Sequence, residues 1–401
     1  MSLFDKFEQI AAARQPFVER GIRSNVVMEK VISSTEAVIN GRPVILAGTN
    51  NYLGLTFDPD CIEAASMAVK EHGTGTTGSR MANGSYADHV QLEQELADFF
   101  GCQYGMVFST GYIANLAMLS ALTGPGDVLL IDADSHASIY DGCRLSGAEI
   151  IRFRHNDPEN LAKRLQRLSE RTSNTLIVVE GIYSMMGDRA PLAEIAGVKE
   201  EYGACLLVDE AHSLGVLGPN GRGLAEEAGV EDSVDFIVGT FSKSLGAIGG
   251  FCVSNHPAME MIPLAARPYI FTASSSPSVI ASTRQALKIL KARPELRSKL
   301  WDNAHHLYEM LQQSGFQLGP EPSPVVAVRV ANIDQVIVAW KGLLEAGVYV
   351  NMVTPPATPD GGCLLRCSVS AGHSTRQIEQ IVSAFASLKE AVPVAETAQS
   401  L

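Results

Sequence analysis

The chain has 401 residues, of which 46% are hydrophobic and 19% charged, and its formal net charge is −13. This length exceeds a usual single core and predicts two domains, or one large domain with an appendage. The negative charge argues against nucleic acid as a partner. No apolar stretch is long enough to cross a bilayer, and residues 1–8 are too polar for a secretory signal.

The seven cysteines lie singly, mostly within apolar runs. An odd and scattered set is typical of buried free thiols in a reducing compartment, so we expect a cytoplasmic protein. Cys363 and Cys367 form the only close pair, and no second pair completes a zinc site. We therefore expect no metal centre.

Residues 1–58 are predicted to form an N-terminal segment of one helix and a strand pair. The helix is expected from Asp5 to Glu19. The turn Asn40-Gly41, between the apolar runs 37–39 and 43–46, is typical of a β-hairpin.

Residues 59–275 alternate between helical and strand patterns, which predicts a large domain built on a mainly parallel sheet covered on both faces. Helices are expected over Ile62–Glu71, His89–Phe100, Tyr112–Leu122, Ile139–Ser146, Pro158–Leu168 and Ala193–Tyr202. Strands are expected over Gly105–Phe108, Val128–Ile131, Ile150–Phe153, Leu176–Val179, Cys205–Val208, Phe236–Val238 and Gly250–Val253. Ligands of such sheets bind beyond the carboxyl ends of the strands.

Residues 276–401 are predicted to form a linking helix and a smaller C-terminal α+β domain. The linking helix is expected over Ser278–Ser314. The expected strands are Val325–Val330, Val348–Val350 and Leu364–Ser368, and the expected helices are Ile333–Glu345 and Thr375–Val392.

The most informative residue is Lys243, which lies in a hydroxyl-rich, glycine-flanked turn directly after the strand that ends at Val238. An arbitrary lysine at this place is a surface residue. Here Thr240 and Ser242 offer hydroxyls suited to a phosphate, and Gly246 allows close backbone approach. We interpret Lys243 as a desolvated amine that forms a Schiff base with pyridoxal 5′-phosphate (PLP).

Asp209 follows the neighbouring apolar strand and is the acidic partner that a PLP ring nitrogen needs. Taken alone, it could equally cap a helix. His212 lies in the same turn and is placed to hydrogen-bond the phenolic oxygen of the cofactor. His136 follows the strand Val128–Ile131, and its flat ring is suited to stack on the pyridine and to reach a substrate carboxylate.

The turn before Gly111 and Tyr112 links a strand to a helix, and backbone amides at a glycine-opened helix N-terminus bind anions. We interpret Gly111 and Tyr112 as neighbours of the cofactor phosphate.

Two further residues are candidates for substrate binding. Asn51 belongs either to a structural turn or to a substrate contact, and Arg366, inside an apolar strand, either pairs with an internal carboxylate or clamps an amino acid carboxylate.

These residues together resemble the α-oxoamine synthases, a fold-type I PLP-dependent transferase family. The matching stretches are residues 108–112, 132–142, 208–213, 218–223, 238–244 and 267–274. The likeness runs from about Phe4 to the last helix.

The resemblance implies a PLP enzyme that condenses a small amino acid, L-serine in the nearest case, with a long-chain acyl thioester such as palmitoyl-CoA. Carbon dioxide is lost, and the product 3-ketodihydrosphingosine begins sphingolipid synthesis. It implies Lys243, His136 and Asp209 as catalytic residues. It assigns the cofactor pocket to Gly111, Tyr112, His136, Asp209, His212, Thr240, Ser242, Lys243 and Thr272, and the substrate side to Asn51 and Arg366. It also implies a homodimer with shared active sites, in which Thr272 contacts the phosphate bound by the other subunit.

One position departs from the family pattern. Members that use serine carry an arginine just before a Pro-Pro-Ala-Thr-Pro segment, and this chain has Thr354 there. Carboxylate recognition then depends on His136 and Arg366, or the amino acid differs. A sibling synthase that uses glycine or alanine with another acyl thioester, or an aminoketone autoinducer synthase, therefore stays open as an alternative.

Overall fold

The computed structural model describes residues 3–22, 25–358 and 361–389. The chain divides into two compact units, residues 50–301 and residues 1–49 with 302–401. Residues 50–58 and 276–301 thus belong to the larger unit, and residues 1–49 of the N-terminal segment belong to the smaller. The division of the sequence into 1–58, 59–275 and 276–401 stays a prediction about domains.

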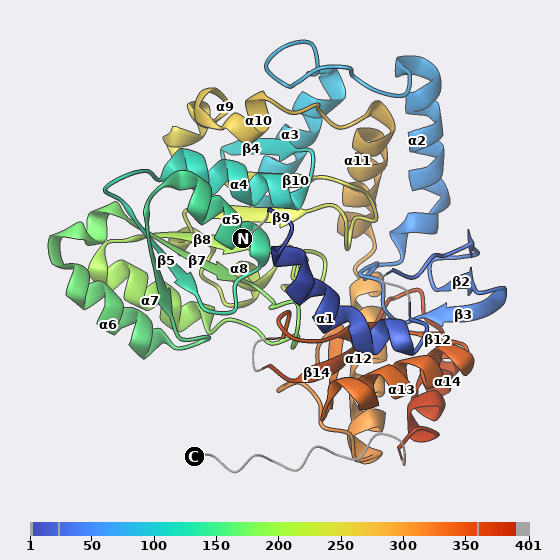
Figure 1. The fold of residues 1–401 in the computed structure, drawn as a ribbon. Coiled ribbons are helices and arrows are strands. Elements are labelled where there is room, and N and C mark those ends of the chain that lie inside the picture. The colour runs from blue at the N-terminus through green and yellow to red at the C-terminus, as the bar shows by residue number, and fades with distance from the viewer. Residues whose placement is uncertain (1–2, 23–24, 359–360, 390–401) are drawn as a thin grey trace. The chain divides into compact units, whose positions relative to one another are not determined.

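The larger unit is built on a seven-stranded sheet with the order β4-β10-β9-β8-β7-β5-β6. Its strands are β4 (Tyr104–Phe108), β5 (Val128–Asp132), β6 (Glu149–Phe153), β7 (Thr175–Glu180), β8 (Cys205–Asp209), β9 (Phe236–Thr240) and β10 (Gly250–Ser254). The pairs β5–β6, β5–β7, β7–β8 and β8–β9 are parallel, and β10 runs antiparallel to both of its neighbours. The predicted mainly parallel α/β sheet is confirmed, and Figure 1 shows its strands side by side with helices around them.

The sheet forms the core because its central strands are apolar without alternation. Every residue of β5 and β7 is buried, as expected for strands covered on both faces. Met118 and Leu119 pack from a helix against Leu129, Ile131 and Val178 in one cluster of buried side chains.

The helices of the larger unit are α2 (Pro59–His72), α3 (Ala87–Phe100), α4 (Gly111–Leu122), α5 (Ala137–Ser146), α6 (Pro158–Leu168), α7 (Leu192–Tyr202), α8 (Leu224–Glu227), α9 (Ile262–Ala265), α10 (Arg267–Ile270) and α11 (Pro277–Ala292), and α12 (Glu295–Gln313) continues into the smaller unit. Helices α2 to α7 begin close to the predicted residues, whereas the short helices α8, α9 and α10 of the larger unit were not predicted. Short 3₁₀ turns cover Leu55–Phe57, Ser169–Asn174, Glu231–Ser233 and Pro257–Glu260.

The single long helix predicted over Ser278–Ser314 is wrong, because the structure has two helices there. α11 ends at Ala292, and Arg293 leaves the helical region with φ −126° and ψ 66°. Pro294 follows, and its ring disfavours helical geometry at the residue before it. Pro294 was therefore a sequence signal for the end of the helix.

The smaller unit contains α1 (Lys6–Glu19) and two small sheets. The first has the order β1 (Lys30–Val31), β2 (Glu36–Ile39), β3 (Arg42–Leu46) and β12 (Val348–Tyr349), and the second β11 (Val325–Val330), β14 (Cys363–Ser368) and β13 (Asn351–Val353). The predicted hairpin is confirmed, with Asn40 and Gly41 both at positive φ.

Two helices complete the smaller unit, α13 (Ile333–Glu345) and α14 (Thr375–Ala386). The predicted extension of α14 to Val392 is too long, and residues 390–392 lie outside the described part of the chain. The other elements predicted for this part of the chain are present, and the short strands β1 and β13 were not predicted.

All seven cysteines are free, five of them buried and Cys102 and Cys205 half-buried. Within the ranges that the structure describes, no helix is both long and apolar enough to cross a membrane. Among the same residues, no group of three His, Cys, Asp or Glu side chains is arranged to hold a metal ion.

Candidate active site

Polar side chains gather where neighbouring strands of the large sheet end. Asp209 is the last residue of β8, and Lys243 follows three residues after the end of β9. Glu180 closes β7 directly opposite Asp209 in the parallel register. Because parallel strands present their carboxyl ends at one edge, these groups share the edge where ligands bind such sheets.

Asp209 is buried and held by two donors. Its Oδ2 accepts a hydrogen bond from Asn115 Nδ2 at 2.7 Å, and its Oδ1 accepts one from the backbone N–H of Ala211 at 2.9 Å. Two donors stabilise the ionised carboxylate and fix its direction. The structure therefore presents an oriented carboxylate at this edge, and does not use Asp209 merely as a helix cap.

His136 precedes α5 and is fixed through its backbone and its ring. Its N–H donates to Glu180 Oε1 at 2.5 Å, and its Nδ1 accepts the N–H of Ser138 at 3.2 Å. The residue keeps an exposed face. Even so, the protein atoms around its ring lower the pKa of His136, the charge of Asp209 opposes this shift, and the charge of Lys243 adds to it.

The same charges act on Glu180. Burial first, and then the charge of Asp209, raise the pKa of Glu180 well above its ordinary value, while Lys243 acts in the opposite direction. Since Asp209 and Lys243 influence both His136 and Glu180, the structure brings these four residues into one site.

His212 is buried, and its Nδ1 lies 2.7 Å from the hydroxyl of Tyr52. Tyr52 is fully buried and was not predicted as a site residue. Asn51, its neighbour, donates from Nδ2 to Thr56 Oγ1 at 2.7 Å. Residues 51 and 52 thus belong to the larger unit, in which Tyr52 contacts His212.

The first turn of α4 approaches the end of β9 closely. A Cβ atom on Gly111 would lie 2.8 Å from Thr240 Cβ, so only glycine allows this contact. Thr240 Oγ1 lies 2.9 Å from Ser242 Oγ and donates to the carbonyl of Gly249 at 2.8 Å. The N-terminus of α4, where backbone N–H groups favour an anion, therefore lies beside the hydroxyls of Thr240 and Ser242.

Two of the predicted cofactor residues lie less centrally. Tyr112 is 41% exposed, and its hydroxyl donates to Asp141 on α5. Thr272 is half-buried and lines a small cavity of about 10 Å³ with Ser109 and Ile113, at the start of α4.

Arg366 lies on β14 of the smaller unit and is 5% exposed. Its Nη1 donates to Ser368 Oγ at 3.0 Å. In the ladder it stands between Ala327 of β11 and Asn351 of β13. Thr354 follows β13 by one residue in the same unit.

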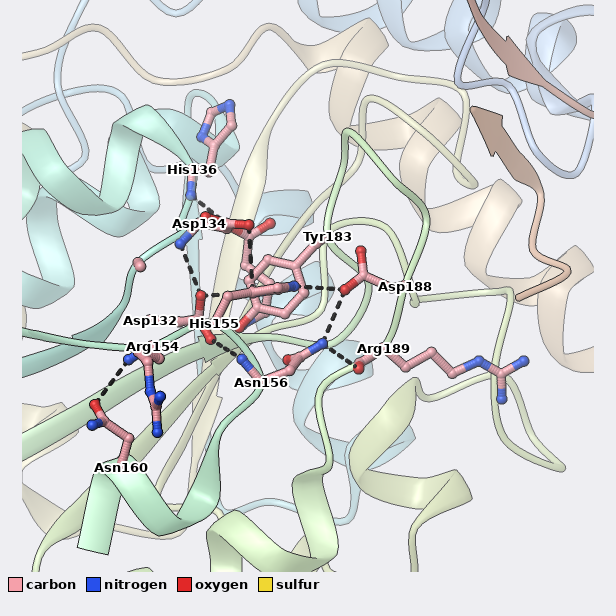
Figure 2. A network of polar contacts seen from close by, with 12 residues as sticks. Asp132, Asp134, His136, Arg154, His155, Asn156, Asn160, Tyr183, Asp188 and Arg189 are labelled. Atoms are coloured by element: carbon pink, nitrogen blue, oxygen red, sulfur yellow. Dashed lines mark hydrogen bonds and ion pairs between the residues drawn. The ribbon is translucent and has the colours of Figure 1, made fainter. Parts of the chain in front are cut away.

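A second polar network supports the loop that carries His136 (Figure 2). His155 lies between two carboxylates, with Nδ1 2.8 Å from Asp132 Oδ1 and Nε2 2.6 Å from Asp188 Oδ2. Burial alone lowers the pKa of His155, but the two carboxylates outweigh it and raise this pKa to about 10. Asn156 binds the same two carboxylates through its N–H and its side-chain amide.

Comparison with known proteins decides the family. The family model "Aminotransferase class I and II" matches residues 42–385. The serine palmitoyltransferase of Caulobacter vibrioides is 58% identical over 99% of this chain and 98% of its own length. The serine palmitoyltransferase of Sphingomonas paucimobilis is 51% identical over 98% of this chain and 94% of its own length. A solved structure of a variant S. paucimobilis enzyme, with a bound PLP–myriocin aldimine, aligns with a TM-score of 0.95 at 50% identity, covering 98% of this chain and 99% of that one.

This chain belongs to the serine palmitoyltransferase family, within the class I and II aminotransferases. Enzymes of this family depend on PLP, which needs an amine for its aldehyde, an acid for its ring nitrogen and an anion site for its phosphate. The larger unit offers Lys243, the oriented carboxylate of Asp209, and the glycine-opened N-terminus of α4 beside Thr240. The residues present fit this cofactor.

Four residues of the site were not found from the sequence: Tyr52, Asn115, Ser138 and Glu180. Glu180 carried a signal, because it ends a buried strand next to the one that ends in Asp209. The other three reach the site only through the packing of helices and loops, which leaves no local pattern in the sequence.

Proposed function

We propose that this chain condenses L-serine with palmitoyl-CoA, releases carbon dioxide and forms 3-ketodihydrosphingosine, the first intermediate of sphingolipid synthesis. The observation that carries the proposal is 58% identity to a serine palmitoyltransferase over nearly the whole of both chains. The parallel pairing of β8 and β9 supports it, because Asp209 ends one strand and the turn that carries Lys243 follows the other at the same sheet edge.

In this proposal Lys243 holds the cofactor aldehyde through its amine and later takes the proton from the amino acid Cα. Asp209 keeps a proton on the pyridine nitrogen. The bound cofactor supplies a ring that absorbs the negative charge left at Cα. His212 would bind the phenolic oxygen, and the contact between its Nδ1 and the Tyr52 hydroxyl helps to fix the ring.

His136 would stack on the pyridine ring and help to orient the serine carboxylate and the thioester. Gly111, Tyr112, Thr240 and Ser242 would hold the cofactor phosphate. Tyr112 contributes through its backbone and ring, since its hydroxyl is engaged by Asp141. Asn51 and Arg366 bind the substrate. With Thr354 at the position of the family arginine, the carboxylate of serine relies on His136 and Arg366.

The active enzyme is a cytoplasmic homodimer in which Thr272 of one subunit contacts the phosphate bound by the other. The exposed position of the neighbouring Phe271, at 72%, supports an interface on this segment. Sedimentation at twice the 42.9 kDa of one chain is expected. A monomer that is fully active would contradict the shared site.

The proposal is tested by a product assay read by mass spectrometry. Purified enzyme is incubated with serine, glycine or alanine and a series of acyl-CoA lengths. The expected product is the 18-carbon aminoketone from serine and palmitoyl-CoA, abolished in Lys243→Ala and retained in Lys163→Ala, a control on the exposed face of α6. Preference for glycine or alanine, or for short acyl chains, would assign a sibling synthase instead.

A further inference from the structure

We infer that Asn115 and Ser138 are positioning residues that connect Asp209 to His136 and hold the His136 ring with its proton on Nε2. The inference deepens the proposed function, because it concerns the two side chains assigned to the pyridine nitrogen and to the pyridine face. Neither Asn115 nor Ser138 touches the reacting atoms in this account.

The connection is a chain of short contacts. Asn115 Nδ2, on α4, donates to Asp209 Oδ2 at 2.7 Å and to Ser138 Oγ at 3.0 Å. Ser138 Oγ, on α5, lies 2.7 Å from His136 Nδ1. Asn115 is 2% exposed and Ser138 1%, so water does not compete for these bonds.

The direction of each bond follows from the carboxylate. Asp209 accepts hydrogen bonds, so the Asn115 amide must turn its NH₂ group toward it. The Asn115 Oδ1 atom is then buried without a hydrogen-bond partner in the described part of the chain. Burying an oxygen without a hydrogen-bond partner costs free energy. This cost indicates that the two hydrogen bonds donated by the Asn115 NH₂ group matter more here than a bond accepted by its Oδ1 atom.

The same logic fixes the tautomer of His136. Ser138 Oγ accepts from Asn115, so its single proton is directed to His136 Nδ1. The Ser138 backbone N–H points at the same Nδ1 atom at 3.2 Å. Two donors on Nδ1 require a lone pair there, which leaves the ring proton on Nε2 and disfavours the imidazolium form.

The local electrostatics agree with this arrangement. Burial is the main cause of the lowered pKa of His136. The charge of Asp209 opposes this shift and the charge of Lys243 adds to it. Glu180 holds the backbone of the same residue. A neutral ring would stack on the cofactor without adding a positive charge beside Lys243.

The close approach of two helices makes the connection possible. Gly142 on α5 faces α4, and a Cβ atom there would lie 2.9 Å from Leu119 Cδ1 and 3.0 Å from the carbonyl oxygen of Asn115. A larger residue would separate the helices and draw Ser138 away from Asn115.

The test is ¹⁵N NMR of the imidazole groups in the full chain labelled at its nine histidines, with and without PLP. The His136 signals are assigned by their loss in His136→Asn. In the wild type we expect a neutral ring with Nε2 protonated. In Ser138→Ala the pKa of His136 should rise by about 0.5–1 unit, the equivalent of one lost hydrogen bond to the neutral form.

Matched controls separate positioning from general damage. Ser146→Ala, on the same helix, removes a hydroxyl bonded to the Cys143 carbonyl and should leave the His136 signals unchanged. Asn115→Leu should weaken PLP binding about tenfold, because Asp209 loses a donor, whereas Ser120→Ala on the same helix should not. If Asn115→Leu does not fold, the NMR measurement on Ser138→Ala tests the inference by itself.

A wild-type ring protonated on Nδ1, or equal spectra for Ser138→Ala and Ser146→Ala, would overturn the inference. These readouts do not require turnover. An enzyme that failed the serine and palmitoyl-CoA assay but showed the expected tautomer would refute the proposed reaction and leave the positioning roles intact.

Discussion

His155 is a cation enclosed by Asp132 and Asp188 beside the loop that carries His136. Its side chain is 27% exposed, so solvent screens the two ion pairs only in part. The enclosure stabilises the fold only while the imidazole is charged. Because the folded pKa of about 10 lies above the ordinary value of about 6.5, this stabilisation is complete below about pH 6.5 and is lost as the pH rises toward 10.

His155→Gln should therefore be less stable than the wild type by an amount that depends on pH. The difference in the free energy of unfolding should be largest near pH 6 and shrink by up to about 1.4 kcal/mol per pH unit between about pH 6.5 and 10. Urea unfolding at several pH values measures it, with His72→Gln, on the exposed end of α2, as the control. A difference that did not change with pH would mean that His155 is not charged in the fold.

At the residue scale, prediction from sequence succeeded where a residue ends a strand. Lys243, Asp209 and His136 each follow a buried apolar run, and parallel strands bring such ends to one edge. The approach failed for Asn115 and Ser138, which lie inside helices. Whether a helical side chain points at the site depends on helix rotation and spacing, and the sequence near each residue does not specify these.

At the scale of elements, α4 and α5 are in close contact near the site. This contact depends on Gly142, which has no room for a Cβ atom against Leu119 and the Asn115 carbonyl. The helix pattern predicted both elements correctly, but it did not show that this glycine sets their distance.

Gly142→Ala should destabilise the protein by about 1–3 kcal/mol, since overpacking a tight contact forces the backbone to move. It should also weaken PLP binding, because Ser138 and Asn115 separate. Gly197→Ala on α7 is the matched control: a Cβ atom there meets nothing within 4 Å, so the change should be neutral or stabilising, by up to about 1 kcal/mol. Denaturant unfolding of both variants measures the contrast, and equal effects would contradict the packing argument.

The break between α11 and α12 is the clearest error of the sequence reading at this scale. Apolar periodicity continues across Pro294, so the pattern alone predicts one helix. The proline disfavours helical geometry at Arg293, and the structure ends α11 there. The proline therefore ends the helix even though the apolar periodicity continues beyond it.

At the scale of the whole molecule, the alternation of strands and helices was enough to predict the α/β class and the mainly parallel sheet. The association of residues 1–49 with residues 302–401 was not predictable, because it depends on pairing of β3 with β12 across about 300 residues. Arg366 and Thr354 belong to that smaller unit, so the residues that the proposed function assigns to the amino acid include some far in sequence from Lys243.

The central claim is that the amine of Lys243 carries the cofactor aldehyde at the edge where Asp209 ends its strand. Borohydride reduction of the PLP-loaded protein, followed by proteolysis and tandem mass spectrometry, tests it directly. We expect a phosphopyridoxyl group on Lys243. Finding that group on a different lysine, or on none, would contradict the account.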